Sequence, residues 1–204
     1  MAMAGRHRWA KRQVLYGGHV AANAFYKITK GIVAELEDFA DGRRQIVAIR
    51  TVGDFCGYPP RKGRYVFTGQ AITPVEACAF GAEQFRAYMV RDAEFACAVA
   101  DKVSERLNQA LTRLTIVGQF SALERVAHFI VDMEKRLPSH SIDSDPVALH
   151  LTRQEIAEYL GLKLETVSRA FSKLRQMRLI ALGSADVVAI LNRKRLREVA
   201  SGRL

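Results

Sequence analysis

The stretch LTRQEIAEYLGLKLETVSRAFSKLRQMRLIAL, residues 151–182, holds two short segments of helical apolar periodicity that meet at one glycine. Thr152 and Glu155 form the capping box T-x-x-E, so we expect a helix to begin directly after Thr152 and to end at Gly161. A second helix is predicted over residues 164–177. Two helices joined by a short turn that contains glycine are typical of a helix-turn-helix.

The segments on either side of this motif extend it. RLIAL and VVAIL, separated by a short turn that begins with Gly183 and Ser184, predict a β-hairpin that would form a wing. Asn192 is expected to cap a final basic helix, RKRLREVA. Upstream, residues 121–137 predict another amphipathic helix, followed by the polar connector PSHSIDSDP. The C-terminal part of the chain therefore reads as a winged helix-turn-helix.

The second helix of the motif has a polar face that points to DNA. Glu165, Ser168 and Arg169 are spaced i, i+3 and i+4, so they project from one side of the helix. The other side is apolar and carries Val167, Phe171 and Leu174. In the major groove an arginine can donate to guanine O6 and N7, a glutamate can accept from cytosine N4, and a serine can contact a smaller group such as a thymine edge.

The alternative is an exposed ion pair between Glu165 and Arg169, which would stabilise the helix by only about 0.2–0.5 kcal/mol. Within a winged helix-turn-helix we prefer the DNA-reading interpretation, because each bidentate base contact is worth about 1–3 kcal/mol of discrimination.

The first part of the chain predicts strands. FYKITKGIVAEL, RQIVAIR and RYVFTGQAIT are rich in β-forming residues and lie between residues 13 and 80. Turn signals separate these runs at Gly17-Gly18, Asp41-Gly42 and Gly53-Asp54. A small antiparallel barrel or roll is the expected result.

From about Glu83 the periodicity becomes helical, and Asp92 is the expected N-cap of a long helix that reaches toward Gly118. Apolar residues within it alternate in spacing between four and three positions, as in the a/d seam of a coiled coil. This seam consists of Ala96, Ala100, Val103, Leu107, Ala110, Leu114 and Val117. We expect the seam to form a parallel homodimer, while Phe95, Val99 and Leu111 pack on the roll. The alternative is that the seam itself packs on the roll.

Composition limits the class of protein. The 204 residues are 49% hydrophobic and 25% charged, as in globular domains, and the net charge of +10 favours an anionic partner such as nucleic acid. The basic start is not followed by the apolar run of an export signal, and no stretch is long enough to span a membrane, so a cytoplasmic protein is expected. Cys56, Cys78 and Cys97 fit neither a disulfide framework nor a C-x-x-C metal site, and we expect buried reduced thiols.

The order of roll, long heptad helix and LTRQEIAEYLGLKLETVSRAFSKL closely resembles the Crp/Fnr superfamily of bacterial transcription regulators over nearly the whole chain. The resemblance implies an α+β fold. Its expected parts are an N-terminal antiparallel β-roll like a cyclic-nucleotide-binding domain (a double-stranded β-helix, residues 1–91), a dimerisation helix (92–120) and a C-terminal winged helix-turn-helix (121–204).

The resemblance also assigns DNA contacts. The E-x-x-S-R triplet matches the one by which the Fnr and FixK branches read TTGAT-type half-sites, and FTGQAITPVEACAF is more like these branches as well. The remaining predicted DNA contacts, which include positions that commonly touch phosphate, are Thr152, Arg153, Gln154, Lys163, Thr166 and Lys173. Lys163 departs from the family pattern, in which serine or threonine caps the helix.

Other departures concern effectors. GYPPRKGRYVFTGQA replaces the G-E-L and R-S/T-A elements of the cyclic-nucleotide branch: Tyr58 stands for the glutamate and Phe67 and Thr68 lie near the arginine position, so cAMP binding is not expected. A basic loop with Arg61, Lys62 and Arg64 is interpreted as solvated, with binding of another anion as the alternative. Cys78 matches one cluster ligand of Fnr, but one thiol cannot replace four. His7 and His19 are interpreted as surface residues, with haem ligation as the alternative.

Together these observations predict a homodimeric, cytoplasmic DNA-binding regulator of the FixK type, and an activator in particular. Its expected partners are double-stranded DNA and RNA polymerase, its expected role is oxygen-limitation, nitrogen or respiratory gene control, and no cofactor or metal is expected. The alternative is a ligand-sensing regulator with haem or an organic anion in the roll. An enzyme is not expected, because the sequence contains no paired nucleophile and base, phosphate loop or metal spacing.

Overall fold

The computed structural model describes residues 4–58, 63–137, 146–183 and 186–202. The chain divides into two compact units, residues 1–112 and 113–204, and helix α2 (Ala93–Gln119) runs through the boundary. Within the described residues no helix is long and apolar enough to cross a membrane.

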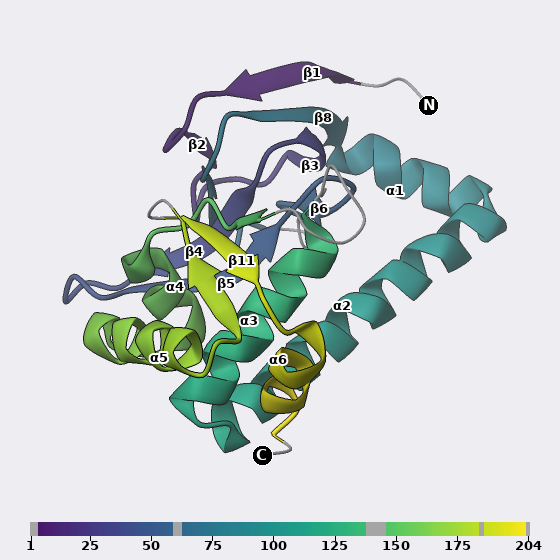
Figure 1. Cartoon of the computed structure of the whole chain (residues 1–204). Helices are drawn as coiled ribbons and strands as arrows, with labels where there is room; N and C mark the ends of the chain where they lie inside the picture. Colours follow the sequence, from purple (N-terminus) through teal and green to yellow (C-terminus); the bar gives the residue numbers. More distant parts are fainter. Residues whose placement is uncertain (1–3, 59–62, 138–145, 184–185, 203–204) are drawn as a thin grey trace. The chain divides into compact units, whose positions relative to one another are not determined.

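The first unit is a roll made of two antiparallel four-stranded sheets, with strand orders β1-β8-β3-β6 and β2-β7-β4-β5 (Figure 1). The strands of the first sheet are β1 (Ala4–Trp9), β8 (Val75–Gly81), β3 (Ala24–Lys30) and β6 (Phe55–Cys56). The strands of the second are β2 (Val14–Tyr16), β7 (Thr68–Ala71), β4 (Val33–Asp38) and β5 (Arg44–Arg50). The predicted roll is confirmed.

The strand boundaries differ from the prediction at several positions. The basic segment around Arg6 and Arg8 forms the edge strand β1, which the sequence did not suggest because its charged residues break the apolar alternation. An edge strand tolerates them because its outer side meets water. Residues 64–67, by contrast, lie outside the strand β7 that was expected to include them.

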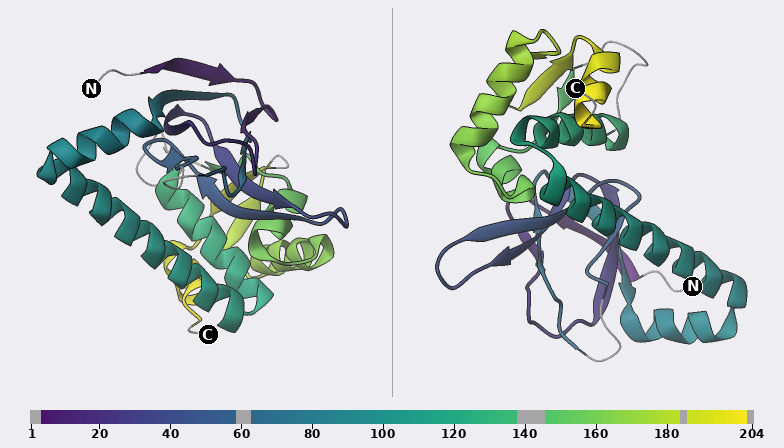
Figure 2. Two further views of the ribbon diagram at one scale, coloured as in Figure 1. Left: turned by 180° about the vertical axis from the view of Figure 1, so that it is seen from behind. Right: turned by 90° about the horizontal axis from the view of Figure 1, so that it is seen from below.

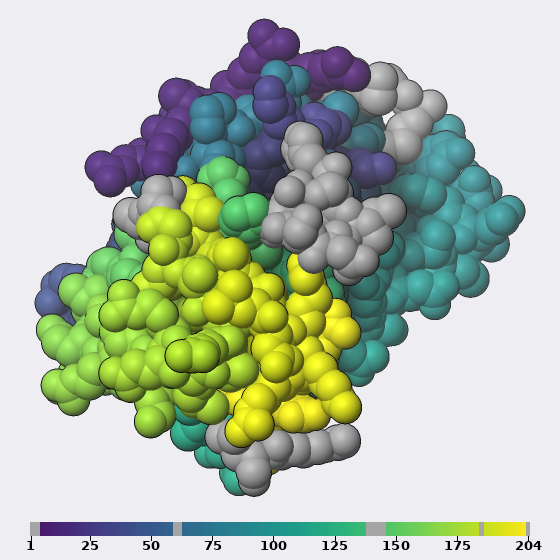
Figure 3. Space-filling model, in the orientation of Figure 1, coloured from purple at the N-terminus to yellow at the C-terminus, as the bar shows by residue number. Residues whose placement is uncertain are grey.

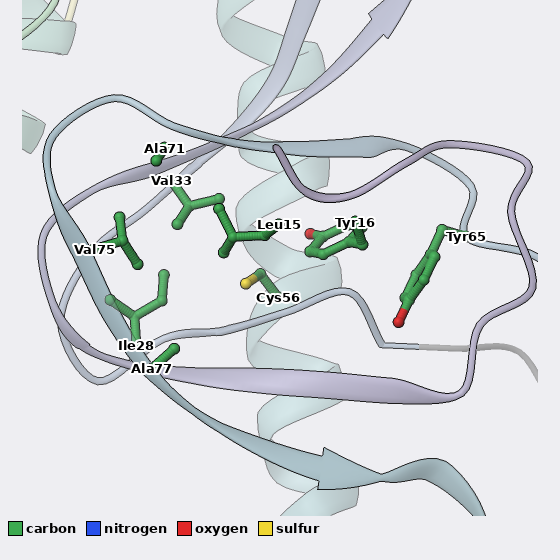
Figure 4. Close-up of a cluster of buried hydrophobic side chains, with 9 residues drawn as sticks. All are labelled: Leu15, Tyr16, Ile28, Val33, Cys56, Tyr65, Ala71, Val75 and Ala77. Carbon is green, nitrogen blue, oxygen red and sulfur yellow. The ribbon is translucent and has the colours of Figure 1, made fainter. Parts of the chain in front are cut away.

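Side chains from both sheets fill the space between them. Buried residues of this cluster include Leu15, Ile28, Val33 and Val75, and Figure 4 shows the Tyr16 and Tyr65 rings lying side by side next to Cys56. The interior thus holds aromatic and polar groups as well as aliphatic ones.

Two helices follow the roll. α1 (Ala82–Arg91) ends at Asp92, whose extended backbone turns the chain into α2, as Figure 2 shows. The Asp92 carboxylate Oδ1 accepts from the Phe95 amide at 2.9 Å, which confirms Asp92 as the cap of α2. The helix ends at Gln119, close to the predicted position.

The second unit consists of four helices and a small sheet among its described residues. The elements after α2 are α3 (Ala122–Arg136), β9 (Val147–Ala148), α4 (Arg153–Leu160), α5 (Leu164–Gln176), β10 (Ile180–Leu182), β11 (Val187–Ile190) and α6 (Arg193–Ala200). α3 packs against both α5 and α6 (Figure 2, right). The predicted wing is confirmed by the pairing of β10 with β11, and β9 adds a third strand that was too short to predict. The connector PSHSIDSDP lies largely outside the described residues.

Candidate nucleic-acid interface

Local interactions fix the turn between α4 and α5. The Thr152 hydroxyl accepts from the Glu155 amide at 3.1 Å, and a Glu155 carboxylate oxygen accepts from the Thr152 amide at 2.7 Å. Gly161 ends α4 in the left-handed region at φ 64°, where a side chain would be strained. The capping box, the glycine and the helix-turn-helix are thus confirmed.

The apolar sides of the two helices are buried against the unit's core. Val167, Phe171 and Leu174 of α5 are at most 1% exposed. α4 contributes Ile156, Ala157 and Leu160, which are also buried. Because one side of α5 is fixed in the core, its opposite side must face outward (Figure 3, light green).

The three residues of the predicted triplet are brought together on that outward face. Glu165, Ser168 and Arg169 are all exposed. Neither Glu165 nor Arg169 forms an ion pair with any residue that the structure describes. The alternative interpretation of these two residues as a surface ion pair is therefore not supported, and their hydrogen-bonding groups stay open to a partner.

The outward face continues toward the C-terminal end of α5. Ser168 and Arg169 line a shallow depression together with Ser172, Lys173 and Gln176. Lys173 was predicted at the interface, whereas Ser172 and Gln176 were not. Their positions, four and eight residues after Ser168, continue the same face and could have identified them.

The start of α5 holds two unusual residues. Lys163 occupies the N-cap position with an extended backbone, and its side chain makes no capping hydrogen bond. Leu164, the first residue of the helix, is 39% exposed although it is large and apolar. Leu164 is not among the predicted DNA contacts. Thr166, which is a predicted contact, is half-buried.

The predicted phosphate contacts at the start of α4 are arranged differently from one another. Thr152 and Gln154 are exposed, and the Gln154 amide donates to Glu158 at 3.1 Å. Arg153 lies over the Phe171 ring, with its guanidinium carbon 3.4 Å from the ring centroid. Its Nη1 is buried without a hydrogen bond, and burial lowers the pKa of the Arg153 guanidinium.

The seam of α2 is largely on the surface. Leu107 is 59% and Leu114 68% exposed, and Val103 and Val117 are exposed as well. Ala100 and Ala110 are also exposed, whereas Ala96 is half-buried.

The residues expected to pack on the roll are only partly those observed. Phe95 and Val99 are half-buried, but Leu111 is 51% exposed, so its assignment to the roll side was wrong. The reason is that Arg106 takes the inward position: its Nη2 donates to the Phe55 carbonyl oxygen. Leu111, four residues after Leu107, shares the outer side with the seam.

Among the described residues, the thiols and histidines do not gather into one site. Only Cys56 is buried, and burial raises its pKa to about 12, whereas Cys78 is half-buried and Cys97 exposed, which corrects the expectation of three buried thiols. His7 and His19 are exposed. Within the described part of the chain, no group of three or more His, Cys, Asp or Glu side chains is arranged to hold a metal ion.

The basic loop is described only in part. Arg61 and Lys62 lie outside the described residues, whereas Arg64 Nη1 donates to the His19 carbonyl oxygen at 2.7 Å. Tyr58 packs near Phe25, with ring centroids 5.6 Å apart.

Comparisons with known proteins agree with this architecture. A model of the cyclic nucleotide-binding domain matches residues 6–92, and a model of the Crp-like helix-turn-helix domain matches residues 124–199. The chain is 32% identical to the transcriptional activatory protein AadR of Rhodopseudomonas palustris over 194 residues, which cover 95% of this chain and 80% of that protein. It is 33% identical over 177 residues to the nitrogen fixation regulation protein FixK of Bradyrhizobium diazoefficiens, covering 87% and 74%.

The structure of FixK2 from Bradyrhizobium japonicum superimposes with a TM-score of 0.89 at 28% identity and covers 98% of both chains. The sheets, helices and wing therefore follow one common plan. The chain belongs to the Crp/Fnr family of DNA-binding transcription regulators, which are not enzymes.

Proposed function

We propose that this protein is a transcription activator that binds, as a homodimer, to a palindromic site with TTGAT-like half-sites. The observation that carries the proposal is the outward face of α5, where Glu165, Ser168 and Arg169 are exposed and make no ion pair among the described residues. When one side of a helix is packed in the core, its opposite side can enter the major groove of DNA.

Each residue of this face has a chemically matched base. Arg169 donates two hydrogen bonds to guanine and Glu165 accepts from cytosine on the opposite strand, while Ser168 contacts a neighbouring base. Leu164 adds an apolar contact, since an exposed leucine at the start of α5 suits the methyl group of thymine. A half-site with adjacent thymines and one guanine would use all four residues.

The surrounding polar groups position α5 on the backbone of DNA. Lys163 and Lys173 are exposed cations on either side of the reading residues. Arg153, half-buried over the Phe171 ring at the start of α4, is the third cation of this set. Thr152, Gln154 and Thr166 complete the set of proposed phosphate contacts.

The seam of α2 pairs the two subunits. Leu107 and Leu114 expose more than half of their side-chain surface, and a second copy of the helix would remove it from water. The dimer would present two α5 helices to half-sites about one helical turn apart. Changing Leu107→Glu places two carboxylates together in this contact, so the variant should be monomeric by light scattering and lose affinity for a palindrome.

The relatives suggest the process that is controlled. AadR is described as an activatory protein and FixK as a regulator of nitrogen fixation. We extend this to oxygen-limitation, nitrogen or respiratory gene control in the cytoplasm, with RNA polymerase as the partner that the bound activator contacts.

Selection from random DNA tests the proposal directly. The purified dimer should enrich a palindrome with a TTGAT-like half-site, and transcription with bacterial RNA polymerase from a promoter that carries this site should rise. Enrichment of no palindrome would contradict the proposal. A Soret band in the purified protein would instead favour the haem-sensing alternative.

A further inference from the structure

The roll interior contains a buried carboxylate. Glu35 lies on β4 and is only 8% exposed. Its Oε2 accepts from Arg50 Nε at 2.8 Å and Nη2 at 2.7 Å. Its Oε1 accepts from the Tyr16 hydroxyl at 2.8 Å and from the Gly57 amide at 3.3 Å. A guanidinium, a phenol and a backbone amide thus form a cradle for one anionic group.

The Tyr16 ring closes the space beside this cradle. It lies 4.5 Å from the Tyr65 ring and 5.8 Å from the Tyr26 ring, measured between centroids, and Figure 4 shows it inside the roll. A Cβ atom added at Gly69 would lie 2.4 Å from the Tyr16 ring, and one at Gly57 would lie 2.9 Å from it. Glycine inside a strand often marks such a close approach.

These features do not fit a cyclic nucleotide. The family model for that domain covers the whole cradle, yet a phosphate placed there would meet the Glu35 carboxylate, and a base or ribose would meet the Tyr16 ring. The cradle already holds an anion that belongs to the chain.

The cradle is also connected to the long helix. Gly57, which donates to Glu35, directly follows β6. On the same short strand, the Phe55 carbonyl oxygen accepts from Arg106 of α2. The short segment 55–57, which is β6 and the residue after it, therefore contacts the buried carboxylate through Gly57 and α2 through Phe55.

Stability alone does not explain why these charges are kept. A buried ion pair is often matched or exceeded in stability by apolar residues of similar volume, because removing two charges from water is costly. Among the described residues, Glu35 and Thr51 are the buried polar ones, whereas the buried cluster that contains Tyr16 and Cys56 is largely apolar. A role other than stabilisation is therefore indicated.

We infer that Glu35 is a built-in anionic ligand of the roll: its carboxylate occupies an anion site formed by Arg50, Tyr16 and Gly57, and through β6 and Arg106 it holds α2 in the conformation that binds DNA. The inference rests on the proposed function. The site accepts a small carboxylate as its ligand. In this protein the carboxylate of Glu35 is that ligand.

Chemical rescue tests the anion site. Glu35→Ala removes a CH₂–COO⁻ group that acetate closely replaces. We expect the variant to melt at a lower temperature and to bind its palindrome about tenfold more weakly. Acetate, but not chloride at equal ionic strength, should restore both. Leu36→Ala is the matched control, because Leu36 is the next residue of β4 and 1% exposed but has no part in the cradle. It should melt lower without any response to acetate.

A double variant separates a functional from a structural role. In Glu35→Gln with Arg50→Met, the amide oxygen still accepts from Tyr16 and Gly57 while both charges are gone. We expect stability near that of the wild type but DNA binding about tenfold weaker. Binding equal to the wild type would overturn the inference, and so would a Glu35→Ala variant whose melting and affinity both ignore acetate.

The same experiments distinguish failure of the inference from failure of the proposed function. Melting with acetate reports on the anion site without any DNA. If the wild type selects no palindrome, the proposed function fails whatever acetate does; if it selects one and the double variant binds it equally well, only the inference fails.

Discussion

Two combinations of a glutamate and an arginine in this protein differ in whether they form an ion pair. On neighbouring strands of the roll, Glu35 and Arg50 approach to 2.7 Å with side chains only 11% and 18% exposed. On α5, Glu165 and Arg169 stand one helical turn apart, both exposed, and neither forms an ion pair within the described structure. The same two side-chain types are thus paired in one region and left apart in the other.

Water explains the difference. A charge removed from water must be compensated, so the buried carboxylate is surrounded by donors. On the surface, water solvates both charges, and their attraction nearly cancels the entropy lost on fixing two long side chains. Unpaired exposed charges remain free to bind bases. The internal pair is therefore enclosed by donors of the chain itself, whereas the exposed charges keep their hydrogen-bonding groups open to an outside partner.

The largest effect is expected from breaking the buried pair on one side. Arg50→Met leaves the Glu35 carboxylate buried without its cation, which should lower the free energy of unfolding of the roll by about 3–5 kcal/mol. Denaturant titration followed by a probe in the roll measures it. Arg43→Met is the matched control, because Arg43 pairs with Asp41 on the surface with its side chain 76% exposed, and it should change stability by less than about 0.5 kcal/mol.

For the exposed combination, Glu165 and Arg169, we expect a large effect on DNA binding and a small effect on folding stability. Arg169→Ala is expected to change the free energy of unfolding by less than about 0.5 kcal/mol. It should weaken specific DNA binding by about 1–3 kcal/mol per half-site and relax the preference at one guanine. Arg175→Ala on the same helix, also exposed but on another side, should leave that preference unchanged. An unchanged guanine preference in Arg169→Ala would remove Arg169 from the reading surface.

Lys163 is a surface charge in a position that is unfavourable for folding. A cation at a helix N-terminus opposes the helix dipole, and the cap bond is missing, so Lys163→Thr should raise the free energy of unfolding by about 1 kcal/mol. If the lysine neutralises one phosphate per subunit, the variant should bind DNA more weakly and change the salt slope by about two per dimer. Higher stability with an unchanged slope would make Lys163 only a poor cap.

The smallest effect concerns His128, a half-buried titratable side chain of α3. Burial lowers the pKa of His128 on α3 below 6.5, although the nearby Asp132 acts in the opposite direction. Below pH 6.5 the unfolded chain then binds a proton that the folded chain does not, so stability should fall as the pH drops below that value. His128→Gln should flatten this part of the profile measured by thermal melting. A profile that is unchanged in the variant would assign the acid sensitivity to other groups.

Interactions between near neighbours in the chain were sufficient to predict the helix-turn-helix. The capping box of Thr152 and Glu155, the stop at Gly161 and the outward position of Glu165, Ser168 and Arg169 all depend on contacts within four residues or on helical periodicity. The cap of α2 by Asp92 is equally local. For such elements the sequence itself contains both partners of each interaction, close together.

Other features required the tertiary structure. Leu111 was placed on the wrong side of α2 because Arg106, through the Phe55 carbonyl, decides which side of the helix meets the roll. The pairing of Glu35 with Arg50 was not predicted, because it depends on the register of β4 and β5. In that register Glu35 lies opposite Ala48, and the register shifts directly after Glu35. A one-residue shift in register turns a side chain to the other face of a sheet, so only the folded pairing of distant strands decides which charges meet.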